Sequence, residues 1–83
     1  MDQIARTPKQ LGEILRRRRK ELGFSQEVLG SRVNLRQSTI STLESSTADT
    51  KLATLFDSLA ALDLEVVIRP RTKGSAKDIE ALF

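Results

Sequence analysis

The fold of this chain is decided by the stretch Phe24-Ser-Gln-Glu-Val-Leu-Gly-Ser-Arg-Val-Asn-Leu-Arg-Gln-Ser-Thr-Ile-Ser-Thr-Leu-Glu44. It contains two short helical patterns, over residues 26–33 and 36–44, separated by a corner at Val33-Asn34-Leu35. We expect the first helix to bury Val28, Leu29 and Val33, and the second to bury Ile40 and Leu43. The second helix then turns outward a face of mostly short polar residues, namely Arg36, Gln37, Ser38, Ser41 and Thr42. A polar helix held by a short supporting helix is the shape that enters a DNA major groove.

Start and stop signals predict a preceding helix over about 8–22. Thr7 is suited to cap it, Pro8 fits its first turn, and Gln10 stands where a capping-box partner belongs. Gly23 can take the left-handed conformation that ends a helix. The apolar stripe of this predicted helix consists of Leu11, Ile14, Leu15 and Leu22.

Similar signals organise the rest of the helical region. Ser25 is expected to cap the helix over 26–33, and Asn34 tolerates the positive φ that the corner needs. We expect Gly30 to lie opposite the branched Ile40 where these two helices cross. A fourth helix, capped by Asp49 or Thr50, follows from a stripe at helical spacing: Leu52, Leu55, Phe56, Leu59 and Leu62. Phe56 is expected in the core, and Phe24 against the first helix.

The segment 64–69 changes to an alternating pattern. Leu64, Val66 and Ile68 alternate, Val67 adds a further branched residue, and Pro70 ends the run, which predicts a β-strand. A single strand is not stable alone, and the chain offers no second one. We therefore expect it to pair with the same strand of a second copy across a two-fold axis. The alternative is a frayed tail.

Composition excludes several classes of function. The chain has no cysteine and no histidine, which excludes disulfides, thiolate metal sites and histidine-based catalysis. Carboxylate or lysine chemistry stays open, but no acidic pair or other catalytic constellation stands out, so we expect no metal site, no cofactor and no enzymatic activity. No apolar run approaches a membrane span, and residues 1–8 lack a secretory signal, which predicts a cytoplasmic protein. The net charge of +3 is compatible with a nucleic-acid partner.

The run Arg16-Arg-Arg-Arg-Lys20 is not expected to form one phosphate-binding patch. Successive helical residues point about 100° apart, so these cations cannot all face one DNA strand. Arg18 lies near the apolar stripe and is expected to lay its stem along it. Arg16, Arg17 and Lys20 are expected to be solvated, with contact to DNA as the alternative.

The residues that carry a family resemblance are Ser25-Gln26-Glu27, Gly30, Val33-Asn34, Gln37-Ser38, Ile40-Ser41 and Leu43-Glu44. With these, residues 8–62 resemble the phage-repressor and Xre-type helix-turn-helix family. The resemblance implies a mostly α, compact, four-helix lambda-repressor-like domain, here followed by the dimerising strand. It also implies that Arg19 pairs with Glu44 and that Gln26 braces Gln37.

The same resemblance assigns the DNA contacts. Base edges are expected to meet Arg36, Gln37, Ser38 and Ser41. The DNA backbone is expected to meet Ser25, Gln26, Thr39, Thr42 and Ser46. Chemistry agrees, because a glutamine amide can bond adenine N6 and N7 together and an arginine can pair with guanine.

Thr7-Pro8, Gly23 followed by an aromatic residue, Arg36–Ser41 and Asp63-Leu64-Glu65 are similar to the HipB-type antitoxins. That likeness implies a homodimeric repressor of its own operon, a palindromic double-stranded operator, and a HipA-type serine/threonine kinase toxin as partner. A plain phage- or plasmid-type repressor and a protein-interaction module stay open as alternatives.

The expected organisation is a disordered N-terminus over 1–6, the helix-turn-helix DNA-binding and dimerisation domain over 7–69, and a flexible tail over 70–83. The tail ends in Ile79, Leu82 and Phe83. These residues can form a short motif that docks on a partner, or they can be a disordered remnant.

Overall fold

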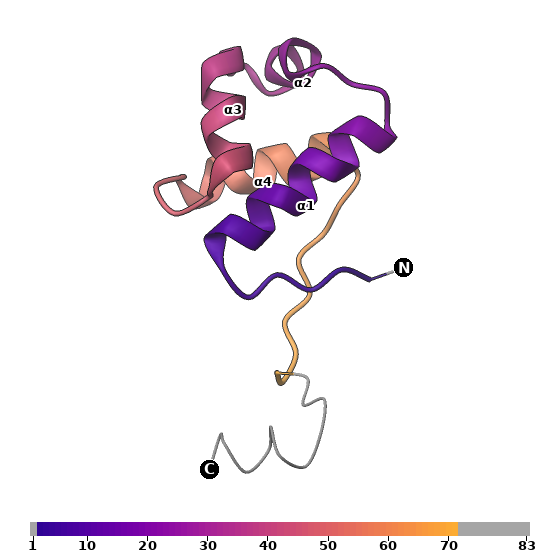
Figure 1. Ribbon diagram of the computed structural model, residues 1–83, viewed down its shortest axis with the longest axis vertical. Coiled ribbons are helices and arrows are strands. Elements are labelled where there is room, and N and C mark those ends of the chain that lie inside the picture. Colours follow the sequence, from indigo (N-terminus) through magenta and orange to yellow (C-terminus); the bar gives the residue numbers. More distant parts are fainter. Residues whose placement is uncertain (1, 72–83) are drawn as a thin grey trace.

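Residues 2–71 are described by the structure, a computed structural model. Within them the chain forms four helices, α1 (Pro8–Glu21), α2 (Gln26–Val33), α3 (Gln37–Ser45) and α4 (Leu52–Ala61) (Figure 1). The bounds of the first three agree with the predicted ones to within one residue. A mostly helical domain with the helix-turn-helix arrangement is therefore confirmed.

The predicted caps explain these bounds. Thr7 Oγ1 accepts from the backbone N–H of Gln10 at 3.1 Å, and Ser25 Oγ accepts from that of Val28 at 3.0 Å. Gln10 returns a bond, but its Oε1 accepts from the N–H of Arg6 at 2.7 Å, one residue before the cap. Gly23 and Asn34 have φ of 76° and 57°, which confirms the left-handed turns after α1 and α2.

The predicted cap of α4 is wrong. The N-cap residue is Lys51, and no side chain bonds the first turn. Thr50 lies one residue too early because its N–H closes a turn onto the carbonyl of Thr47 at 3.1 Å. The start of α4 is therefore set by this turn and by packing.

Six buried apolar residues from all four helices and the end of α4 form the core: Leu15, Leu29, Ile40, Leu43, Leu59 and Leu62. Helix α3 packs against α1 and α2, and α2 also packs against α4. Gly30 permits the corner, because a Cβ there would overlap the carbonyl oxygen of Leu35 and would lie 3.5 Å from the Ile40 side chain. The expected Gly30–Ile40 crossing is thus present.

Four apolar residues of the predicted stripes and core are exposed. Val28 is 42% exposed, Phe56 48%, Leu52 68% and Leu22 36%. Val28 and Phe56 lie at the flank of their helix's apolar stripe, whereas Leu52 is the first residue of α4 and Leu22 the C-cap of α1, where a small domain offers little to cover a side chain. Phe24 is half-buried against the core, and its ring carries the guanidinium of Arg32 at 4.4 Å.

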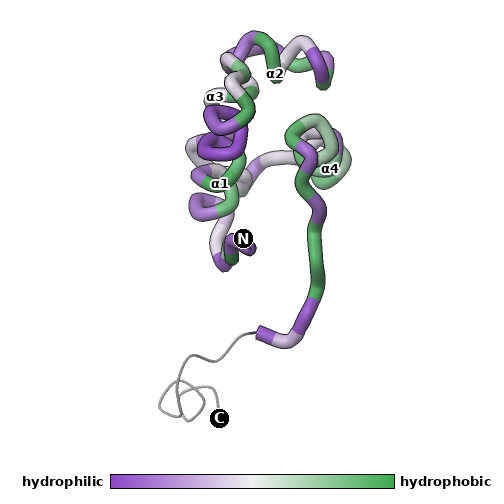
Figure 2. The backbone as a smooth tube through the Cα atoms, turned by 90° about the vertical axis from the view of Figure 1, so that its right-hand side faces the viewer, coloured by the Kyte–Doolittle hydropathy of each residue, from purple (hydrophilic) through white to green (hydrophobic). Residues whose placement is uncertain are grey.

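Segment 64–71 leaves the end of α4 and runs away from the helices in both views (Figures 1 and 2). Leu64 packs against the core, whereas Val66, Val67 and Ile68 are exposed. Arg18 fixes the exit, since its Nε donates to the carbonyl of Leu62 at 2.9 Å. Within residues 2–71 no strand is formed, and the strand pairing stays a prediction.

The predicted partner-binding tail, with Ile79, Leu82 and Phe83, lies outside the described residues. Among residues 2–71, no helix has both the length and the apolar character that crossing a bilayer requires.

Candidate nucleic-acid interface

The outer face of α3 carries the residues predicted to contact DNA. Six of its residues are exposed, and Arg36 is also exposed at the N-cap position, where its side chain makes no capping bond. The exposed residues within α3 are Gln37, Ser38, Thr39, Ser41, Thr42 and Ser45. One helix therefore presents an amide, hydroxyls and a guanidinium along one side.

The hydroxyls of this face differ in how they are engaged. Thr42 Oγ1 donates to the carbonyl of Ser38 at 3.0 Å, and Ser45 Oγ donates to that of Ser41 at 3.1 Å. Their oxygens can still accept, but their protons are held by the helix. Ser46, predicted to contact the DNA backbone, is half-buried, and its Oγ accepts from the N–H of Ala48 at 3.2 Å.

The start of α2 lies beside the start of α3. Ser25, also expected at the DNA backbone, uses its hydroxyl oxygen to cap α2. Gln26 is half-buried, and its Oε1 accepts from Gln37 Nε2 at 3.3 Å, so the brace implied by the resemblance is present. The structure thus brings the predicted residues of both helices to one surface.

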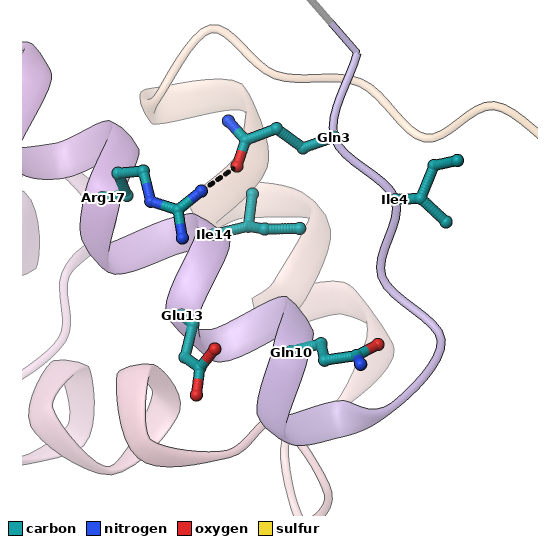
Figure 3. Close-up of a pocket in the computed structure, with 6 residues that line it drawn as sticks. All are labelled: Gln3, Ile4, Gln10, Glu13, Ile14 and Arg17. Carbon is teal, nitrogen blue, oxygen red and sulfur yellow. Dashed lines mark hydrogen bonds between the residues drawn. The ribbon is translucent and has the colours of Figure 1, made fainter.

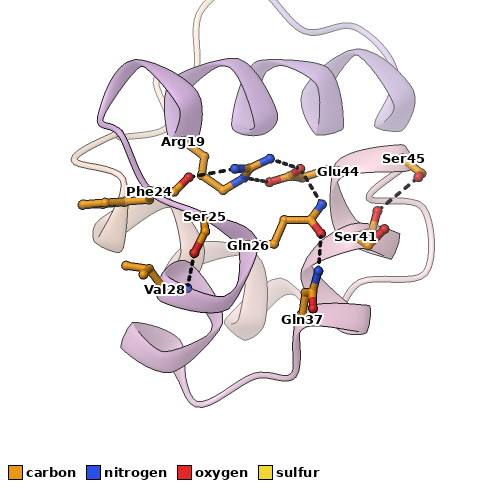
Figure 4. Close-up of polar contacts among 9 residues, drawn as sticks. All are labelled: Arg19, Phe24, Ser25, Gln26, Val28, Gln37, Ser41, Glu44 and Ser45. Atoms are coloured by element: carbon orange, nitrogen blue, oxygen red, sulfur yellow. Dashed lines mark hydrogen bonds and ion pairs between the residues drawn. The ribbon is translucent and has the colours of Figure 1, made fainter.

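A buried ion pair underlies this brace (Figure 4). Arg19 and Glu44 are 7% and 5% exposed, and Arg19 Nη2 donates to Glu44 Oε1 at 3.1 Å while Nε donates to Oε2. Arg19 Nη1 also donates to the carbonyl of Phe24 at 2.7 Å. Glu44 Oε1 accepts a further bond from Gln26 Nε2 at 3.1 Å. The predicted Arg19–Glu44 pair is therefore the inner end of a chain that reaches Gln37.

Two tertiary contacts of this region go beyond the predicted ones. Gly12 of α1 lies against the backbone of Glu44, and a Cβ there would come within 2.7 Å of the Glu44 carbonyl oxygen. Thr47, just after α3, donates to the carbonyl of Pro8 from both its N–H and its hydroxyl. A small residue inside an apolar stripe is the only sequence signal for the first contact, and the second has none.

A separate hollow of about 320 Å³ lies where the N-terminal segment turns back along α1 (Figure 3). Arg17 Nη1 donates to Gln3 Oε1 at 2.8 Å across it. Arg16, Arg17 and Lys20 are exposed, as predicted, and Arg17 has this partner as well. None of the residues predicted to touch DNA lines the hollow.

Comparison with known proteins places this geometry in a family. The family described as "Helix-turn-helix domain" matches residues 10–67. The chain belongs to this helix-turn-helix family. Antitoxin HipB of Escherichia coli O6:H1 is 31% identical over 74 residues, which cover 89% of this chain and 79% of HipB.

Solved HipB structures have the same fold. A HipB variant in complex with an O2 20mer superposes with a TM-score of 0.79 at 28% identity, covering 87% of this chain and all (100%) of the HipB chain. A HipA–HipB–O2–O3 complex gives a TM-score of 0.78 at 28% identity, with 86% and 100% covered. The chain is therefore a HipB-like member of the helix-turn-helix family.

Proposed function

We propose that this chain is a sequence-specific repressor that binds double-stranded DNA as a homodimer. The observation that carries the proposal is the exposed polar face of α3, held in place from below by Gln26 and the buried Arg19–Glu44 pair. A helix face that only contacts water does not require its side chains to be held in one position. A glutamine that reads a base edge does require a fixed position, since direct readout depends on hydrogen-bond geometry.

The proposed division of contacts follows position on this surface. Gln37 and Ser38 read bases from the first turn of α3 and Ser41 from its middle, and Arg36 reads a base or holds a phosphate from the N-cap position. The flanking residues position the domain on the DNA backbone: Ser25, Gln26, Thr39, Thr42 and Ser46. In Ser25, Thr42 and Ser46 the hydroxyl proton or oxygen already takes part in a hydrogen bond, so their contacts with DNA are expected to be the weaker ones.

The homodimer is proposed to form through segment 64–69, within a domain that spans residues 7–69. Val66, Val67 and Ile68 are 49%, 70% and 94% exposed, and the burial of such side chains drives association. Pairing of two such segments across a two-fold axis would cover the face that carries Val66 and Ile68 and satisfy the backbone groups of the whole segment. Two recognition helices would then face a palindromic operator.

We further propose that the chain is the antitoxin of a HipA-type kinase and represses its own operon at the nucleoid. The support is the similarity to HipB, together with a HipB structure that contains HipA. A plain phage- or plasmid-type repressor would bind DNA in the same way but would have no toxin partner. Co-expression of this chain with the kinase of the neighbouring gene distinguishes the two functions, because only an antitoxin should relieve the growth arrest that the kinase causes.

DNA binding is tested by selection from synthetic duplexes with a randomised central region, using the full chain. The expected result is enrichment of a near-palindrome whose half-sites lie about one helical turn, roughly 34 Å, apart. A pool that stays random after repeated rounds would contradict sequence-specific binding. An enriched single half-site without its mirror copy would contradict the dimer and leave base readout standing.

A further inference from the structure

In the chain of hydrogen bonds that joins Gln37, Gln26 and Glu44, only one assignment of donors and acceptors is possible. Glu44 Oε1 and Oε2 are carboxylate oxygens, and both already face the guanidinium of Arg19. An ionised carboxylate accepts hydrogen bonds and donates none. Gln26 must therefore turn its NH₂ toward Glu44, where Nε2 donates at 3.1 Å.

That orientation fixes the next amide. With its NH₂ on Glu44, Gln26 turns its Oε1 toward α3, and an oxygen there can only be met by a donor. Gln37 accordingly presents its NH₂, and Nε2 donates to Gln26 Oε1 at 3.3 Å. If either amide were flipped, two oxygens or two NH₂ groups would face each other. The polarity of an exposed side chain is thus set by a buried charge two links away (Figure 4).

This polarity has a consequence for base recognition. A glutamine NH₂ has two N–H donors, and Gln26 occupies one of those of Gln37. One N–H and the carbonyl oxygen remain, which match the N7 acceptor and N6 donor of adenine. Guanine presents two acceptors, N7 and O6, in the same place and would need both N–H groups.

From this arrangement we infer that Glu44 is a specificity-determining residue: by fixing the direction of the Gln26 brace, it commits one of the two N–H donors of Gln37 and makes Gln37 select adenine over guanine. The inference rests on the proposed function and refines it. Glu44 is a positioning residue here, because it acts on the base only through Gln26 and Gln37. Arg19 has its part by keeping the carboxylate turned toward Gln26.

The test measures the adenine-to-guanine preference at the Gln37 position, on duplexes taken from the randomised selection and substituted at one base pair at a time. A bidentate contact discriminates by roughly 5- to 140-fold. Gln26→Met keeps the length of the side chain and removes the brace, so this ratio should fall toward one. Any contact of Gln26 with a phosphate contributes equally to both duplexes, so its loss lowers both affinities and does not account for a change in their ratio.

A second variant distinguishes polarity from support. In Glu44→Gln, residue 44 can donate, so Gln26 can flip and offer its NH₂ to the oxygen of Gln37, which frees both N–H groups. The base preference should then shift from adenine toward guanine. The melting temperature of the variant, measured by thermal unfolding, gives the temperature below which its DNA binding must be measured. Glu27→Gln is the matched control, since Glu27 is an exposed acid in the first turn of α2. It should keep the wild-type ratio.

A double-mutant cycle completes the experiment. In a Gln37→Ala background, Gln26→Met should no longer alter the adenine-to-guanine ratio, because the amide that it orients is gone. A Gln26→Met variant that retains the wild-type ratio, or a wild type that favours guanine at this position, would overturn the inference. The absence of any preferred sequence for the wild type would instead refute the proposed function itself.

Discussion

Gly12 on α1 lies directly against the backbone carbonyl of Glu44 on α3, and this contact sets how closely the two helices approach. A Cβ at residue 12 would lie 2.7 Å from the Glu44 oxygen and 2.8 Å from that of Leu43. Both neighbours are backbone atoms, which cannot rotate away. The helix that carries the proposed reading residues is thereby seated on α1 at the same residue whose side chain anchors the Gln26–Gln37 brace.

Gly12→Ala should therefore destabilise the fold although alanine favours helix. The gain in helix propensity is about 1 kcal/mol, whereas overpacking a helix contact costs about 1–3 kcal/mol. Urea unfolding should show a lower free energy of unfolding for this variant. Glu13→Ala, at the exposed neighbouring position, is the control and should stay within about 0.5 kcal/mol of wild type. A more stable Gly12→Ala variant would contradict the close approach.

Arg19→Met should cost about 3–5 kcal/mol, since it leaves the Glu44 carboxylate buried without its partner. The double variant Arg19→Met with Glu44→Met should be less destabilised than the sum of the two single changes, because no unpaired charge remains. Chemical denaturation measures all three. Arg16→Met removes an exposed arginine from the same helix and should have little effect. Additive losses in the double variant would argue against coupling of the pair.

Local signals in the sequence predict the fold better than signals that depend on a distant partner. Caps and left-handed turns are set by residues such as Thr7, Ser25 and Asn34 themselves, so α1 to α3 could be placed to within one residue. Burial depends on what covers a helix. Val28 and Phe56 have the right spacing for the core, yet they lie at the edge of the stripe and are 42% and 48% exposed.

The candidate site shows the same division. The polar face of α3 and the Arg19–Glu44 pair could be predicted from the sequence and the family resemblance. The direction of the bonds from Glu44 through Gln26 could not, because it depends on which atoms meet in three dimensions. The close contact at Gly12 could not be predicted for the same reason, since the sequence does not tell which residue a glycine in a helix packs against.

The dimer is tested with Val66→Lys. The charge would be placed on the side of segment 64–69 that includes Leu64, the side that we expect to meet the second copy, so the variant should sediment as a monomer and lose most of its affinity for a palindrome. Val67→Lys makes the same change one residue along, on the opposite face, and should remain a dimer. Two dimeric variants would contradict the paired segment. Two monomeric ones would show that both faces are covered.

The proposed backbone contacts predict a strong salt dependence. The logarithm of the binding constant should fall linearly with the logarithm of salt concentration, by about 0.9 for each phosphate neutralised. Arg36→Gln should reduce this slope by about one if Arg36 holds a phosphate. Arg32→Gln removes the same charge from a residue that stacks on Phe24 and should leave the slope unchanged. A wild-type complex insensitive to salt would contradict the groove-bound arrangement.

The most direct test of base reading by α3 is the affinity of Gln37→Ala for the selected operator and for unrelated duplexes of equal length, by fluorescence anisotropy at one fixed salt concentration. Loss of the amide should cost about 1–3 kcal/mol on the operator, relax the preference at one base pair in each half-site, and leave binding to unrelated DNA almost unchanged. An equal loss on both kinds of duplex, with every base preference retained, would contradict the account.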